Sequence, residues 1–202
     1  MAEVKRTIIP IMLLGDGQVG KTSLIARITG NKFDESLLTT IGKSSHTYEV
    51  LLHGYNLKMK IWDTAGQERF RSMSVGVIKN VEGLILAYSI ENRKSFDNLE
   101  IWLKQLNDVK DISKVPIVIV GNKSDLEGQR VIEYDEGKEF ADKHNYHFYE
   151  VSAKTGQNVK EAFDDIFEQL FQLFEEEITG KKSVSNNLQL NSKKQEKRRR
   201  FC

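Results

Sequence analysis

The sequence has little cysteine and proline, and it lacks any long apolar run. Its single cysteine is Cys202, the last residue, so no intrachain disulfide can form and nothing in the cysteine content indicates secretion. No apolar stretch approaches the ~20 residues that a membrane-spanning helix needs. Lys5-Arg6 before a short apolar segment resembles a signal peptide, but Pro10 interrupts that segment, which favours a buried strand.

What remains is a chain of 202 residues, 39% hydrophobic and 29% charged, which predicts one soluble globular domain with an appendage. The net charge is only +1 but is unevenly distributed. From Lys181 onward, eight basic residues and one acidic residue give +7, which leaves about −6 on residues 1–180. We therefore predict an acidic domain over residues 1–178 and a disordered basic tail over residues 179–202.

Short β-rich runs alternate with helical patterns. The predicted strands are 8–14, 47–53, 57–63, 83–89, 115–121 and 147–151, and the predicted helices are 20–30, 94–110, 134–144 and 158–178. His53-Gly54-Tyr55-Asn56 predicts a hairpin, and each remaining strand precedes a helix. The predicted fold class is therefore α/β, with a six-stranded, mostly parallel sheet, one antiparallel edge strand and helices on both faces.

The last predicted helix has its own start signal and apolar stripe. Asn158 and Glu161 form a capping-box pattern at its start. Apolar side chains then recur at helical spacing, which predicts docking on the sheet, with a partner-binding face as the alternative. These side chains are Phe163, Ile166, Phe167, Leu170, Leu173 and Phe174.

The most informative motif lies between the first strand and the first helix. Gly15-Asp16-Gly17-Gln18-Val19-Gly20-Lys21-Thr22 matches G-x-x-x-x-G-K-[ST], whose backbone N–H groups surround a polyphosphate. Lys21 supplies a charge to the β- and γ-phosphates, and the Thr22 hydroxyl is a ligand for Mg²⁺. The predicted phosphate-binding residues are Asp16, Gly17, Gln18, Val19, Gly20, Lys21, Thr22 and Ser23.

Further polar segments follow other strands, at the sheet edge where open α/β sheets bind ligands. Asp63, at the end of a strand, is placed to hold Mg²⁺. Gly66 allows a backbone N–H to approach a γ-phosphate, and Gln67 can orient an attacking water. In the loop before the second strand, Thr40 can offer its hydroxyl to Mg²⁺ and its N–H to the γ-phosphate.

Two segments near the last strands predict a base-binding site. In Asn122-Lys123-Ser124-Asp125, the Asp125 carboxylate can accept from guanine N1–H and the 2-amino group, which adenine does not offer at that edge. Lys123 can lay its stem over the base, and Asn122 can tie this loop to the phosphate loop. In Ser152-Ala153-Lys154, the Ala153 N–H can donate to guanine O6.

Taken in chain order, these segments resemble the Ras superfamily of small GTPases over residues 7–178. The run from Lys60 to Ser72 (KIWDTAGQERFRS) is similar to the switch II sequence of the Rab family. The absence of a helical insert between Lys21 and Thr40 disfavours a heterotrimeric Gα. The absence of an extra helix before Ser152 disfavours Rho, and Ala2 stands where Arf has its myristoylated glycine.

The resemblance implies further roles. Phe33 would pack against guanine, and Thr40 would be the switch I threonine. Gly17 and Gln67 together imply competence for hydrolysis, slow without an arginine supplied by a partner. Exchange factor, GTPase-activating protein, GDP-dissociation inhibitor and effectors are the implied partners. Mg²⁺ is the implied cofactor, with no nucleic-acid ligand and a monomeric state expected.

The chain also departs from the Rab pattern. After Ile41-Gly42 a Rab normally continues Val-Asp-Phe, whereas here Lys43-Ser44-Ser45-His46 follows. Rabs present an exposed Phe-Trp-Tyr group to effectors, and the matching positions here are Ser45, Trp62 and Val77. We therefore predict a divergent Rab with non-standard effectors.

The tail, from Lys197 to Cys202 (KRRRFC), has two interpretations: a solvated basic run, or a geranylgeranylated Cys202. Rabs usually end in two prenylatable cysteines. One lipid plus a polybasic patch supplies the two signals that stable anchoring requires. The predicted location is the cytoplasmic face of an intracellular membrane, in exchange with the cytosol.

The predicted function is a Rab-like GTP/GDP switch in membrane trafficking that hydrolyses GTP slowly. The alternatives are a scaffold that holds GTP without hydrolysing it, and a metabolic P-loop kinase. For a kinase, the guanine-reading Asn122–Asp125 segment would have no purpose.

Overall fold

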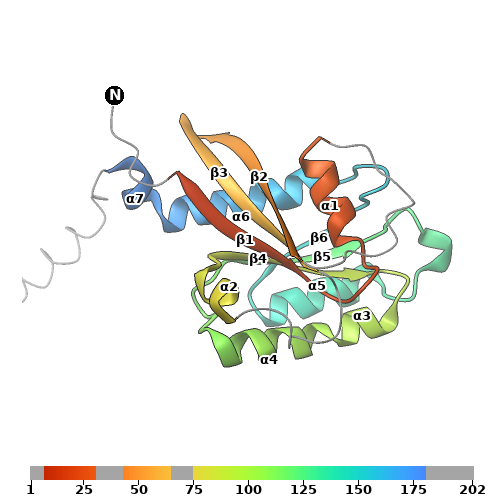
Figure 1. The fold of residues 1–202 in the computed structure, drawn as a ribbon. Helices are drawn as coiled ribbons and strands as arrows, with labels where there is room; N and C mark the ends of the chain where they lie inside the picture. The colour runs from red at the N-terminus through yellow and green to blue at the C-terminus, as the bar shows by residue number, and fades with distance from the viewer. Residues whose placement is uncertain (1–6, 31–42, 65–74, 181–202) are drawn as a thin grey trace, which may run out of the picture.

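A computed structural model describes residues 7–30, 43–64 and 75–180. Its centre is a six-stranded sheet in the order β2-β3-β1-β4-β5-β6 (Figure 1). All neighbouring strands are parallel except β2, which pairs antiparallel with β3 at one edge. This confirms the predicted fold class. The strands are β1 (Ile8–Leu14), β2 (Lys43–Leu52), β3 (Tyr55–Thr64), β4 (Gly83–Ser89), β5 (Ile117–Asn122) and β6 (His147–Glu150).

Helices cover both faces of the sheet (Figure 1). The helices α1 (Lys21–Ile28), α6 (Val159–Leu173) and α7 (Glu175–Thr179) bury side chains in one core. The helices α2 (Val75–Asn80), α3 (Arg93–Asp97), α4 (Leu99–Val109) and α5 (Tyr134–Lys143) bury theirs in the other. None of the helices in these described ranges is long and apolar enough to cross a bilayer.

Most of the apolar stripe of the last predicted helix packs on the sheet, as expected, but Leu173 at the end of α6 is 50% exposed. Phe163, Ile166, Phe167 and Leu170 are buried in the core that α1 and α6 share, and the Phe167 ring stacks on Tyr48 of β2. The helix itself is interrupted at Phe174, so the predicted segment 158–178 is two helices, α6 and α7. Gly180, in a left-handed conformation, ends α7.

The predicted capping box at Asn158 is wrong. Asn158 has a positive φ of 53°, and its side chain makes no capping hydrogen bond. Its Nδ2 donates instead to the Glu150 carbonyl at 2.9 Å, so the side chain closes the loop between β6 and α6. The local sequence pattern is typical of a helix cap, but the Asn158 side chain bonds to Glu150, eight residues earlier in the chain.

Other predicted boundaries also change. The predicted helix 94–110 is interrupted at Asn98, which separates α3 from α4. The two strands of the hairpin are longer than predicted, because β2 begins at Lys43 rather than at residue 47, and β3 runs from Tyr55 to Thr64 rather than over 57–63. The pairs Leu51–Asn56 and Leu52–Tyr55 close the ladder at the turn. The turn is therefore His53-Gly54 alone, with φ of 48° and 84°, the two positive values that a type I′ turn requires. Neither α2 nor the three-residue 3-10 helix Glu127–Gln129 was predicted, since such short elements carry no periodic signal.

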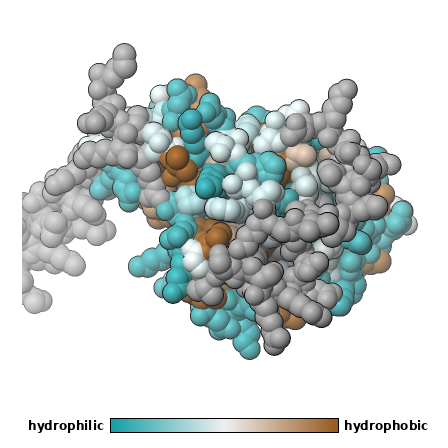
Figure 2. All heavy atoms as spheres, viewed as in Figure 1, coloured by the Kyte–Doolittle hydropathy of each residue, from teal (hydrophilic) through white to brown (hydrophobic). Residues whose placement is uncertain are grey.

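The view in Figure 2 shows a mainly hydrophilic or neutral surface on the described residues, with small separate hydrophobic areas. Large apolar side chains that are exposed come from different elements, as in most folded domains, and do not define one apolar face. They are Ile8, Leu51, Ile101, Val131, Tyr134 and Leu173.

Candidate functional site

The predicted phosphate loop connects the end of β1 to the first turn of α1. Lys21 is the first residue of α1, and only 5% of it is exposed. Its Nζ donates to the carbonyls of Gly15 and Asp16 at 2.8 and 2.6 Å. Burial lowers the pKa of Lys21 to about 8, although Asp63 and Asp16 act in the opposite direction. An anionic ligand at this position would favour the charged form of Lys21.

Gly20 allows the phosphate loop to approach the base-binding segment. Its φ is 93°, and a Cβ atom there would lie 2.3 Å from Nδ2 of Asn122. That Nδ2 donates to the Val19 carbonyl at 2.8 Å. The link between Asn122 and the phosphate loop that the sequence predicted is therefore present, and it requires a glycine beside it.

Thr22 and Asp63 lie together although they come from α1 and β3. The Thr22 hydroxyl donates to Asp63 Oδ2 at 2.8 Å. Asp63 is 1% exposed, its Oδ1 has no hydrogen-bond partner among the described residues, and burial raises its pKa. A hydroxyl and a carboxylate are the oxygen donors that Mg²⁺ prefers. This pair therefore fits the predicted metal site.

The Asp16 carboxylate is directed away from the predicted phosphate position. Its Oδ1 accepts from Trp102 Nε1 at 2.9 Å, and its Oδ2 accepts from Asn98 Nδ2 at 2.6 Å. The side chain thus anchors the phosphate loop to the start of α4. Any part of Asp16 in phosphate binding is left to its backbone.

The two segments predicted to bind the base lie side by side at the ends of β5 and β6. Ser152 Oγ donates to Asp125 Oδ1 at 2.5 Å, and the Ser124 N–H donates to the Val151 carbonyl at 3.0 Å. Asp125 is exposed and so accessible to a ligand. The Lys123 ammonium is paired with Glu91, which fixes the head of the side chain that was predicted to lie over the base.

The Ala153 N–H, predicted to reach guanine O6, donates in this structure to Asn122 Oδ1 at 3.1 Å. The same Asn122 side chain therefore connects Val19 in the phosphate loop to Ala153. Lys154 is exposed, and Gly17, Gln18 and Ser23 lie in or directly after the phosphate loop. Phe33, Thr40, Gly66, Gln67 and Cys202 lie outside the described residues.

The sequence interpretation missed several residues that hold these loops together. Arg27 of α1 donates through Nε to the Ala153 carbonyl at 2.9 Å, and its guanidinium also contacts the Lys154 carbonyl. Arg130, after the Asn122–Asp125 segment, pairs with Glu150 of β6. Arg27 and Ala153 are 126 positions apart, so no local pattern could have indicated their contact.

This fold and these loops define a P-loop nucleotide-binding protein of the α/β class. The sequence model of the Ras family matches residues 10–172. Ras-related protein RGP2 of Oryza sativa subsp. japonica is 41% identical over 161 residues, which cover 80% of this chain and 74% of that protein. Ras-related protein Rab2BV of Beta vulgaris is 35% identical over 178 residues, 88% of this chain and 83% of that protein. The chain belongs to the Ras family of small GTPases and is Rab-like, a family that generally binds guanine nucleotide with Mg²⁺.

The contact between Gly20 and Asn122 leads to a prediction. We expect Gly20→Ala to weaken binding of a fluorescent GDP analogue by at least about tenfold, because the new Cβ would displace a side chain that joins two loops. Equilibrium titration measures the affinity, and urea unfolding measures stability.

Gly54→Ala is the matched control. Gly54 has a similar φ of 84°, but a Cβ there meets nothing within 4 Å. The left-handed backbone should cost both variants about 1–2 kcal/mol of stability. Gly20→Ala should lose more, because it also displaces the Asn122 side chain, and only Gly20→Ala should lose nucleotide affinity. Equal affinities in the two variants would contradict this account of Gly20.

Proposed function

We propose that this protein is a GTP-hydrolysing switch that works at a membrane and recruits effectors in its GTP-bound form. The observation that carries this proposal is the convergence of four segments at one edge of the sheet. Lys21 and Thr22 lie beside Asp63, and Asn122 connects the phosphate loop to the Ser152–Lys154 segment. A site for a triphosphate would thus adjoin a site for a guanine base.

In the proposed reaction, water attacks the γ-phosphate, the bond from the γ-phosphorus to the bridging oxygen breaks, and GDP and phosphate leave, while the chain's residues bind and orient the reactants. Lys21 and the phosphate-loop N–H groups would stabilise the charge on the phosphates. Thr22, Asp63 and Thr40 would hold Mg²⁺, which supplies charge neutralisation when bound. Gln67 would orient the water. Asp125 would select guanine, because an adenine base would leave its carboxylate without the two donors.

A GTP-binding scaffold without turnover is the second candidate. The departures from the Rab pattern at Ser44, Ser45 and His46 favour it, since they lie on β2 next to the strand that carries Asp63. Ser44 pairs with Asp63 in the β2–β3 ladder. Gly17, Thr40 and Gln67, which are retained in the sequence, favour hydrolysis.

Single-turnover hydrolysis separates the two candidates. The natural chain loaded with GTP should convert it slowly to GDP, and Gln67→Leu should slow this by at least about tenfold, because the attacking water loses its orienting group. Phosphate release measures the rate, and competition with ATP measures base selectivity.

Gln172→Leu is the control, because it makes the same chemical change at an exposed position of α6. Its rate should equal that of the natural chain. Tight GTP binding with no hydrolysis in any of the three proteins would favour the scaffold. Equal affinity for ATP and GTP would overturn the guanine-specific site.

The proposed effector surface lies where β1, β3 and α2 meet. A groove of about 470 Å³ is lined there by Pro10, Lys60, Trp62 and Val77, together with Ile8, Gly76 and Asn80. The Lys60 ammonium lies 4.7 Å from the centre of the Trp62 ring. A cation therefore covers Trp62, the one aromatic residue of the Rab Phe-Trp-Tyr group that this chain keeps. Ser45 is exposed and pairs with Trp62 in the ladder, and Val77 is half-buried. Compared with a typical Rab, this surface has lost two aromatic side chains.

Restoring those aromatics should create binding to ordinary Rab effectors. We expect Ser45→Phe combined with Val77→Tyr to bind a panel of purified Rab-binding domains, in the GTP-loaded form, at least about tenfold more tightly than the natural chain. Leu173→Phe adds an exposed aromatic to α6, on the other side of the sheet, and should gain nothing. If the double variant also gains nothing, loss of aromatics does not explain the divergence.

The basic tail is proposed to attach the protein to membranes. Prenylation of Cys202 would supply one lipid, and the neighbouring Arg198, Arg199 and Arg200 would add attraction to anionic headgroups. This combination would replace the second lipid of a typical Rab and place the protein on the cytoplasmic face of an intracellular membrane.

Neutralising the three arginines to glutamine should release the prenylated full chain from vesicles that contain phosphatidylserine. Each charge contributes roughly 1 kcal/mol, so partitioning should fall by about two orders of magnitude. Neutralising Lys181 and Lys182, far from Cys202 in the sequence, should have a smaller effect. Unchanged sedimentation of the arginine variant with vesicles would count against the basic charge as a membrane-binding signal. If cells leave Cys202 unprenylated, the proposed lipid signal is absent.

A further inference from the structure

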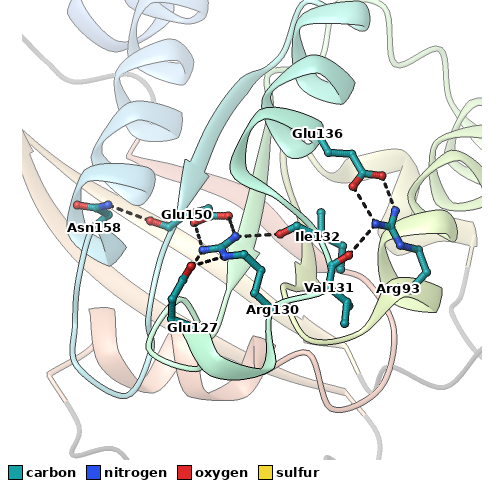
Figure 3. A network of polar contacts seen from close by, with 8 residues as sticks. All are labelled: Arg93, Glu127, Arg130, Val131, Ile132, Glu136, Glu150 and Asn158. Carbon is teal, nitrogen blue, oxygen red and sulfur yellow. Dashed lines mark hydrogen bonds and ion pairs between the residues drawn. The ribbon is translucent and has the colours of Figure 1, made fainter.

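Arg130 lies between two carboxylates just beyond the Asn122–Asp125 segment (Figure 3). Its guanidinium pairs with both oxygens of Glu150, at 2.7 and 2.9 Å. It also pairs with both oxygens of Glu127, at 2.9 and 2.8 Å. The Arg130 and Glu150 side chains are each only 11% exposed, whereas that of Glu127 is 70% exposed. The inner pair with Glu150 is therefore the one that is shielded from water.

Glu150 connects this pair to the second base-binding segment. It is the last residue of β6, two positions before Ser152. Its carbonyl accepts the hydrogen bond from Asn158, at the other end of the same loop. The Ser152–Lys154 segment thus begins two positions after Glu150, which is held through its side chain by Arg130 and through its backbone by Asn158 (Figure 3).

Arg130 also fixes the chain that directly follows the first predicted base-binding segment. One guanidinium nitrogen donates to the Ile132 carbonyl at 2.9 Å, and Glu127 follows Asp125 by two residues. The guanidinium therefore connects the chain before Arg130, at Glu127, and the chain after it, at Ile132, to Glu150 of β6. Between the two segments, Asp125 and Ser152 make the direct contact that would meet a guanine base.

A forked arginine pair fixes orientation as well as distance, because its donors are planar and rigid. Removing one partner of a shielded pair leaves the other charge without compensation, so the loop must move to hydrate it. We propose that Arg130 is a positioning residue that keeps the Asp125 and Ser152 segments in register, and so controls guanine selectivity and nucleotide residence. This inference rests on the proposed guanine-nucleotide function.

A second arginine pair in the same region serves as the comparison. Arg93 forms a bidentate pair with Glu136 and donates to the Val131 carbonyl at 2.8 Å (Figure 3). It holds the same connection between β5 and α5 but forms no hydrogen bond or ion pair with β6 among the described residues. Arg93→Ala should therefore cost some stability without altering base selection.

The experiment compares GDP with IDP, which lacks the 2-amino group that Asp125 would bind. We expect Arg130→Ala to release a fluorescent GDP analogue at least about tenfold faster, and to reduce the ratio of GDP to IDP affinity at least about threefold. Arg93→Ala should keep the natural ratio. General destabilisation would weaken both nucleotides equally, so the ratio reports positioning rather than folding.

Glu150→Gln provides a second variant with nearly the same shape, and it should reduce the ratio as Arg130→Ala does. It decides the question if Arg130→Ala does not fold. Arg130→Lys keeps the positive charge but cannot donate two parallel hydrogen bonds to Glu150. It should therefore restore only part of the ratio of GDP to IDP affinity. An unchanged ratio in a folded Arg130 or Glu150 variant overturns the positioning role and leaves the proposed function intact. A natural chain that binds no GDP overturns the proposed function itself.

Discussion

The candidate nucleotide site depends on one buried amide, the side chain of Asn122. It is 1% exposed, it donates to Val19 in the phosphate loop, and it accepts from Ala153 in the last loop. A buried amide that loses a partner is costly, so each of these loops is held in place by the presence of the other. The fold makes this possible by ending β1, β5 and β6 at the same edge of the sheet.

Most of the fold follows from local patterns in the sequence. Apolar runs of strand length alternate with helical stripes, and this order together with the right-handed crossover rule predicts a parallel sheet covered on both faces. The phosphate loop is also a local feature, since its glycines and Lys21 occupy consecutive positions. The pairing of Thr22 with Asp63 could be expected because Thr22 follows β1, Asp63 lies near the end of β3, and these parallel strands end at the same side of the sheet.

The contacts that were missed join positions far apart in the sequence. Arg27 reaches Ala153 across 126 positions, and Asp16 reaches Trp102 across 86. At Asn158 the local pattern predicted a helix cap that the structure does not form. The side chain hydrogen-bonds the Glu150 carbonyl instead. Side-chain destinations of this kind depend on which loops the fold brings together, and propensity does not contain that information.

Because β2 is the outermost strand of the sheet, changes on its exposed face can be separated from changes in the loops of the candidate nucleotide site. Within the described residues β2 pairs only with β3, and Ser45 stands on it opposite Trp62. The phosphate loop and both base-binding segments follow other strands. An exposed side chain such as Ser45 on this strand can therefore be replaced while the phosphate loop and the two segments after β5 and β6 stay unchanged.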